Sequence, residues 1–190
     1  MNEDPILQPE VIWMQHLREG SEEALASLMR MYYDALYSYA SRFTKDDALI
    51  KDCIQEVFIS LWQRRNTANN ILSFKYYFLR AIKNKVLKAL HKNLRTTSLA
   101  QDGYEFHYEF SIERLIIEKQ ISEENACRLR KTLSCLSTRQ KEIIYLKYYQ
   151  HLDHGQIAEL MNISRQSVYN LLHETINKLR ELWHGEFVTR

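Results

Sequence analysis

Cationic side chains recur at helical spacing in the segment 73–92 and could bind a polyanion. No Asp or Glu interrupts positions 57–101, whereas acidic residues lie on both sides of that window. A basic run of this kind is either a solvated helix face or a surface for phosphates, and its length favours phosphate contact. Asn84 could reach a base or a backbone atom. The predicted contact residues here are Arg80, Lys83, Asn84, Lys88 and Lys92.

Amide and aromatic side chains precede this basic series. The stretch 66–70 is polar, and the start of the following helix is crowded with aromatic residues. Each ring either packs in a core or offers a platform for an unstacked base, and such stacking contributes about 1–3 kcal/mol per base. The residues that could meet a nucleic-acid base are Asn69, Asn70, Tyr76 and Tyr77.

The segment 47–65 carries an apolar stripe on one side and a polar stripe on the other. The stripe expected to be buried consists of Leu49, Cys53, Val57 and Leu61. An isoleucine ringed by acids and amides is typical of a protein-docking surface, although single surface isoleucines are also common. The predicted docking residues on the polar side are Asp52, Gln55, Glu56 and Ile59.

Residues 156–171 have the pattern of a helix-turn-helix, with a plain helical hairpin as the alternative. Ala158 is small where two helices cross closely, and Asn162 can adopt the left-handed conformation at the turn. In such a motif the second helix enters the major groove, where Arg and Gln distinguish guanine and adenine edges. Lys178 and Arg180 are expected to reach phosphate or solvent. The predicted readers are Ser164, Arg165, Gln166, Tyr169, Asn170 and His173.

Helices must position all of these side chains. The 190 residues include only 4 Gly and 2 Pro, with both prolines among the first nine residues, which predicts an all-α fold. Helical periodicity fades between about 96 and 122, so we expect two small helical domains, 10–95 and 123–187, joined by a flexible linker at 96–122. Helix-start signals stand at Ser73, Ser137 with Gln140, Asp153 with Gln156, and Ser164.

No cofactor or metal site is predicted. Cys53, Cys127 and Cys135 lack paired spacing and are expected to be small core residues. We find no Gly-rich phosphate loop, metal-spaced cluster or activated nucleophile, which argues against a nucleic-acid enzyme. No run approaches the roughly 18 apolar residues of a membrane span, so we expect a cytoplasmic protein without membrane insertion.

Two segments resemble one known family. The segment Asp52–Trp62, DCIQEVFISLW, looks like the promoter-melting domain of the extracytoplasmic-function (ECF) sigma factors, a subfamily of the sigma-70 family. The segment 136–144, LSTRQKEII, resembles the family's lead-in to its C-terminal helix-turn-helix. The resemblance extends from about residue 20 to residue 184, in the expected order.

The resemblance implies a non-catalytic initiation subunit that binds core RNA polymerase and directs it to promoters. In the family, the acidic face that corresponds to Asp52, Gln55 and Glu56 binds the clamp helices of the β′ subunit. The loop and helix that correspond to 69–92 hold the melted minus-ten element, with Tyr76 and Tyr77 where members usually have Trp. The C-terminal domain would bind the minus-thirty-five element and the β flap, and an anti-sigma factor commonly holds members inactive.

An ordinary helix-turn-helix regulator with an N-terminal sensing or dimerisation domain is the main alternative. Such a domain has no evident need for the acid-free basic helix in 73–92. Two DNA-binding surfaces separated by a linker are, however, what recognition of two spaced promoter elements requires. The order of features therefore favours the initiation subunit.

Overall fold

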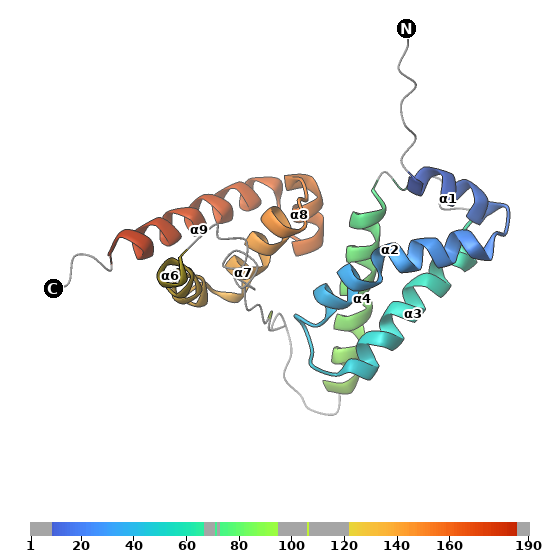
Figure 1. The fold of residues 1–190 in the computed structure, drawn as a ribbon, viewed down its shortest axis with the longest axis horizontal. Helices are drawn as coiled ribbons and strands as arrows, with labels where there is room; N and C mark the ends of the chain where they lie inside the picture. The colour runs from blue at the N-terminus through green and yellow to red at the C-terminus, as the bar shows by residue number, and fades with distance from the viewer. Residues whose placement is uncertain (1–8, 67–70, 72, 95–105, 107–121, 186–190) are drawn as a thin grey trace, which may run out of the picture. The chain divides into compact units, whose positions relative to one another are not determined.

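The computed structural model describes residues 9–66, 71, 73–94, 106 and 122–185 (Figure 1). The described residues form helices and short connections and include no strand, which confirms the predicted all-α fold. None of the helices in these ranges is long and apolar enough to cross a membrane.

The chain divides into two compact helical units, Met1–Tyr104 and Glu105–Arg190. The division falls inside the stretch 96–122 predicted as a linker, most of which lies outside the described residues. Phe106 is an exception. Its ring is buried with its centroid 5.8 Å from that of Tyr145, so this position of the expected linker packs on the second unit.

Four helices make up the described part of the first unit, in which α4 crosses α2 and α3 (Figure 1). Side-chain caps fix where α2 and α3 begin, because Ser21 accepts from Ala24 N and Asp46 from Leu49 N. At the predicted start of α4, Tyr76 N donates to Ser73 Oγ at 3.3 Å. The helices are α1 (Pro9–Arg18), α2 (Glu22–Ala40), α3 (Asp47–Gln63) and α4 (Phe74–Leu94).

Phe78 is the centre of this unit. Its fully buried ring lies 4.9 Å from the Tyr32 ring of α2 and 5.0 Å from the Phe58 ring of α3, measured between centroids. Phe74 and Tyr77, from its own helix, complete the cluster at 6.3 and 5.4 Å. One side chain of α4 therefore joins three helices, and aromatic pairs of this kind add to the free energy gained by burying their area.

In the second unit the sequence predicts the caps that begin α7, α8 and α9, whereas α6 begins at Ser122. Ser137 with Gln140 and Asp153 with Gln156 both form complete capping boxes, and Ser164 Oγ accepts from Ser167 N at 3.0 Å. The elements are α6 (Glu123–Ser134), α7 (Thr138–Ile144), the π-helix η1 (Tyr145–Tyr149), α8 (His154–Met161) and α9 (Arg165–Gly185).

The expectation that all three cysteines are core residues is wrong for two of them. Cys53 is buried in the stripe of α3, and burial raises the pKa of its thiol. Cys127 and Cys135 are exposed, because Cys127 follows the buried Ala126 around α6 and Cys135 lies at the C-terminal cap of that helix. Position on a helix, rather than residue type, decides their burial.

Phe78→Ala should lower the free energy of unfolding of the first unit by about 3–5 kcal/mol, because the cavity would open where three helices meet. Ile59→Ala is the matched control, because the Ile59 side chain is 45% exposed. This variant should change the free energy of unfolding by about 0.5 kcal/mol or less. Hydrogen–deuterium exchange along a urea series measures each unit separately. A loss below about 1 kcal/mol in Phe78→Ala would contradict this account of the core.

Candidate functional site

The outer face of α3 carries the predicted docking residues together. Asp52, Gln55, Glu56 and Ile59 are all exposed. The opposite side of the helix is packed against α2 and α4, which explains why these four side chains point outward. The buried residues of α3 are Ile50, Cys53, Ile54, Val57, Phe58 and Leu61, while Leu49 of the predicted stripe is half-buried.

The basic face of α4 is exposed at most of the predicted positions. Arg80, Asn84, Lys88 and Lys92 are all exposed. Tyr76 and Tyr77 are half-buried, and Arg80 Nη1 donates to the Tyr76 hydroxyl at 3.2 Å. Asn69 and Asn70 lie outside the described residues.

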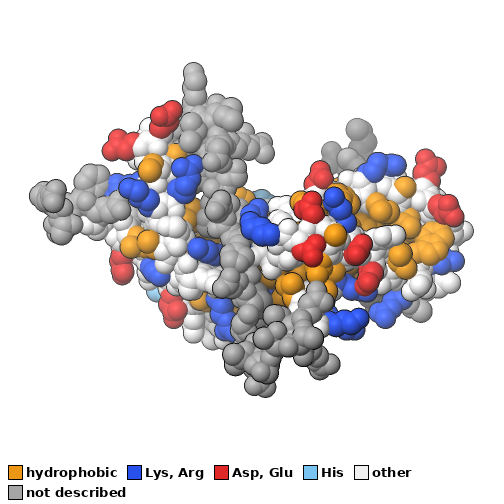
Figure 2. Space-filling view, turned by 90° about the horizontal axis from the view of Figure 1, so that it is seen from below, with side chains coloured by type: hydrophobic (Ala, Val, Ile, Leu, Met, Phe, Trp, Pro, Cys, Tyr) orange, Lys and Arg blue, Asp and Glu red, His pale blue; other side chains and the backbone are white. Residues whose placement is uncertain are grey.

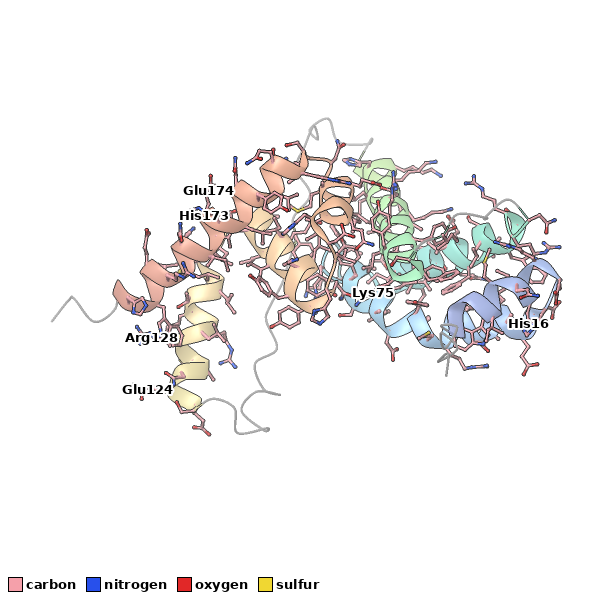
Figure 3. The ribbon with its side chains drawn as sticks, turned by 90° about the horizontal axis from the view of Figure 1, so that it is seen from above. His16, Lys75, Glu124, Arg128, His173 and Glu174 are labelled. Atoms are coloured by element: carbon pink, nitrogen blue, oxygen red, sulfur yellow. The ribbon has the colours of Figure 1, made fainter. Side chains whose placement is uncertain are left out.

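Lys83 corrects the sequence prediction, because it does not belong to this exposed face. It is 4% exposed, and its ammonium lies 5.8 Å from the centroid of the Phe43 ring. At 100° per residue, position 83 is 40° from Leu79 and 60° from Val86, which are both buried. Lys75, at the first turn of α4, is half-buried as well, and burial lowers its pKa (Figure 3).

The acidic face of α3 and the basic face of α4 line one groove. Asp46, Asp52 and Glu56 stand on the α3 wall of this groove, which has a volume of about 1020 Å³. The α4 wall carries Arg80, Asn84, Lys85, Lys88 and Lys92. Figure 2 shows acidic and basic side chains close together on the visible face of the first unit. We call this feature the α3–α4 groove.

An ion pair joins the two walls of the α3–α4 groove. Lys85 Nζ donates to Glu56 Oε2 at 2.7 Å. This hydrogen bond and the charge of Lys85, together with the charges of Lys88 and Lys92, hold the pKa of Glu56 below its ordinary value of 4.5. The two residues are 29 positions apart, so helical periodicity does not pair them.

The turn of the helix-turn-helix has the expected geometry. Asn162 is left-handed, with φ 52° and ψ 49°, and its N–H donates to the Glu159 carbonyl at 3.3 Å. Ile163 N donates to the Ala158 carbonyl at 2.9 Å. Ala158 and Val168 are buried where α8 meets α9, so the small residue allows the predicted close crossing.

All six predicted readers of the second helix or its cap are exposed. They are Ser164, Arg165, Gln166, Tyr169, Asn170 and His173. Ser164 uses its hydroxyl as the cap of α9, and Gln166 Nε2 donates to Asn170 Oδ1 at 3.0 Å. His173 lies beside Glu174 on α9 (Figure 3).

Lys178 corrects a second expectation, because it is half-buried and its ammonium binds within the second unit. Its ammonium donates to the Cys135 carbonyl at 2.9 Å and to Gln140 Oε1 at 3.4 Å. It therefore ties α9 to the connection between α6 and α7, across 43 residues of sequence. Among the residues that the structure covers, no cluster of His, Cys, Asp and Glu could hold a metal ion.

Family models match both units. The model described as Sigma-70 region 2 matches residues 28–96, and the model described as Sigma-70, region 4 matches residues 128–179. The chain belongs to the ECF subfamily of sigma-70 factors. The region 2 match includes α3, α4 and most of α2, where the alternative regulator would have a sensing domain. This sigma factor thus directs transcription initiation.

Curated relatives of this sigma factor come from Bacillus subtilis (strain 168). The ECF RNA polymerase sigma factor SigM is 20% identical over 83% of this chain and 93% of the relative. The ECF RNA polymerase sigma factor SigW is 20% identical over 88% of this chain and 93% of that relative.

Solved structures share the fold of this sigma factor. CnrH in complex with the cytosolic domain of CnrY matches with a TM-score of 0.56 and 19% identity, over 92% of this chain and 97% of that chain. The sigma factor RpoE in complex with the anti-sigma factor NepR from Bartonella quintana matches with a TM-score of 0.52 and 16% identity. This match covers 85% of this chain and 96% of that chain.

Lys85→Met should raise the pKa of the Glu56 carboxyl toward 4.5, because its hydrogen-bond donor and nearest cation are lost. The pair stabilises the fold above pH 4.5, and this contribution disappears as the pH falls through the lowered pKa of Glu56. The contribution of this ion pair to the free energy of unfolding is at most about 1 kcal/mol, because the pair is largely exposed.

An NMR titration of the Glu56 carboxyl carbon measures this pKa directly. Lys51→Met is the control, because Lys51 pairs with Asp47 on the same helix at 3.7 Å and should leave Glu56 unchanged. An unchanged Glu56 titration in Lys85→Met would contradict the assignment of the cause.

Proposed function

We propose that this sigma factor docks on core RNA polymerase through the outer face of α3. The observation that carries the proposal is the exposed cluster Asp52, Gln55, Glu56 and Ile59, which the structure leaves without a helix packed over it. Carboxylates and amides around one apolar side chain suit a charged helical partner. The family resemblance implies that this partner is the clamp helices of the β′ subunit.

The exposed cations of α4 bind the minus-ten region of promoter DNA in this proposal. Arg80, Lys88 and Lys92 meet phosphates, and Asn84 lies on the same face to reach a base or a backbone atom. Tyr76 and Tyr77 are half-buried, so each ring keeps a surface on which an unstacked base could rest. Lys83 is left out of the set because it is buried.

The second helix of the helix-turn-helix reads the minus-thirty-five element. Arg165, Gln166, Tyr169 and Asn170 are exposed in its first turns, which is the part of a recognition helix that meets base edges. By family resemblance, the second unit also contacts the β flap. In this proposal the chain is a non-catalytic subunit, because the polymerase supplies the chemistry, and it acts in the cytoplasm.

An anti-sigma factor is a further partner in this proposal. Among the similar solved structures, RpoE is bound to the anti-sigma factor NepR. A protein of this kind would regulate the chain by covering Asp52, Glu56 and their neighbours. This would prevent polymerase docking.

Asp52→Lys combined with Glu56→Gln should lower the affinity for core polymerase at least about tenfold, because the docking face loses both carboxylates. Asp34→Lys with Glu19→Gln is the matched control, since it makes the same charge change at exposed positions outside α3. Fluorescence anisotropy measures core binding, and run-off transcription on genomic fragments measures promoter use. Normal core binding by the first variant would remove the docking assignment.

Arg165→Ala should weaken binding to the upstream promoter element by about 1–3 kcal/mol and relax the preference at one base pair, if its guanidinium reads a base edge. Arg180→Ala, at an exposed position further along α9, is the control and should keep the preference. Binding of the holoenzyme to promoter variants tests this. A uniform loss on every sequence would move Arg165 to a phosphate contact.

A further inference from the structure

The first turn of α8 touches two of the predicted base readers on α9. The His154 ring lies against the Tyr169 ring, with the centroids 4.2 Å apart and the planes inclined at 47°. Tyr169 nevertheless stays 54% exposed. Part of its ring therefore contacts His154, and the rest remains available to DNA. His154 is half-buried at this contact.

The adjacent residue, Gly155, makes room for the Arg165 side chain. A Cβ at Gly155 would lie 3.1 Å from Arg165 Nη2 and 3.3 Å from Arg165 Nε. The guanidinium therefore occupies the space that a side chain at this position would fill. The same Cβ would lie 3.1 Å from Asp153 Oδ1, the carboxylate oxygen that caps α8.

Arg165 and Tyr169 are one helical turn apart and lie on the same face of α9. His154 and Gly155 are consecutive, so a single turn of α8 faces both readers. Holding a long side chain in one direction removes part of the entropy that it would lose on binding DNA. The direction of the guanidinium also decides which base edge it can reach.

We propose that His154 and Gly155 are specificity-determining positions that act by orienting Tyr169 and Arg165. This inference rests on the proposed function of α9 as the reader of the upstream element. His154 and Gly155 are positioning residues. Gly155 admits the guanidinium beside α8, and His154 supports the Tyr169 ring. An alanine at 155 would press on the Arg165 side chain and on Asp153 Oδ1, each 3.1 Å from the added Cβ. Both are side-chain ends that can shift by a few tenths of an ångström without moving the helices, so the fold would be kept and the base preference altered.

The test uses the holoenzyme formed by the full chain with core RNA polymerase, and DNA fragments with a randomised upstream element. Selection and sequencing of the bound fragments give the preference at each base pair. Gly155→Ala should change the preference at the base pair read by Arg165 roughly fivefold or more, on the scale of one lost base contact. Gly185→Ala is the matched control, because nothing lies within 4 Å of the added Cβ in α9.

The Arg165→Ala background separates orientation from helix stability. Gly155 lies in the first turn of α8, whereas Gly185 is the last residue of α9, so an effect through the stability of α8 would persist when Arg165 is absent. In an Arg165→Ala background, Gly155→Ala should cause no further change in preference. A full additional effect there, or equal effects of Gly155→Ala and Gly185→Ala, would overturn the role of Gly155.

His154 is tested by the loss and return of its ring. His154→Ala should relax the preference at the base pair that Tyr169 contacts, and His154→Phe should restore it by supporting the ring again. If alanine and phenylalanine at this position give the wild-type preference, the role of His154 is refuted. A wild-type holoenzyme that selects no upstream sequence would instead refute the proposed reading by α9, and this inference with it.

Discussion

Burial of the apolar face of α4 against α2 and α3 is the constraint on which the first unit depends. Phe78 contacts aromatic rings from both neighbouring helices, and Leu79, Ile82 and Val86 extend the buried face along α4. Because one face of α4 is packed in the core, the helix cannot rotate about its own axis. The same packing therefore determines that the cations at 80, 88 and 92 face outward and that Lys83 does not.

This packing also brings the proposed polymerase face and the proposed DNA face into one electrostatic environment. The sequence suggests two separate surfaces, an acidic one on α3 and a basic one on α4. In the structure they are opposite walls of the α3–α4 groove, joined by Glu56 and Lys85. A protein partner that binds the Glu56 carboxylate must displace the Lys85 ammonium from it. A phosphate that binds Lys85 would in turn leave the Glu56 carboxylate without its nearest cation. Binding at either wall changes the charge that the other presents.

Local signals in the sequence were sufficient for the helices and for much of the candidate site. The caps at Ser137, Asp153 and Ser164 and the left-handed Asn162 depend on interactions within a few residues, and the structure contains each of them. Exposure of the docking face follows from helical periodicity alone, because position 59 is opposite the buried stripe of α3.

The corrected residues have two different causes. The charge of Lys83 predicts a place on the basic face, although its angle on the helix places it next to the buried Leu79. The contacts of Lys85 with Glu56 and of Lys178 with the Cys135 carbonyl join residues 29 and 43 positions apart. Such pairs depend on how helices pack, and a single sequence contains no periodic signal for them.

The π-helix η1 has a consequence for the residues that follow it. The Gln150 N–H donates to the Tyr145 carbonyl five residues back at 3.0 Å, so this turn contains one residue more than an α-helical turn. The extra residue lies within the turn itself, where Tyr148 and Tyr149 are exposed while Tyr145 at its start and Gln150 just after it are buried. Removing one residue from this turn would return it to regular α-helical spacing and rotate the residues after it by about 100° around the helix axis. The wide turn thus acts as a phase shift in the chain, and it places the buried Gln150 side chain where its Nε2 donates to the Tyr145 hydroxyl at 2.6 Å.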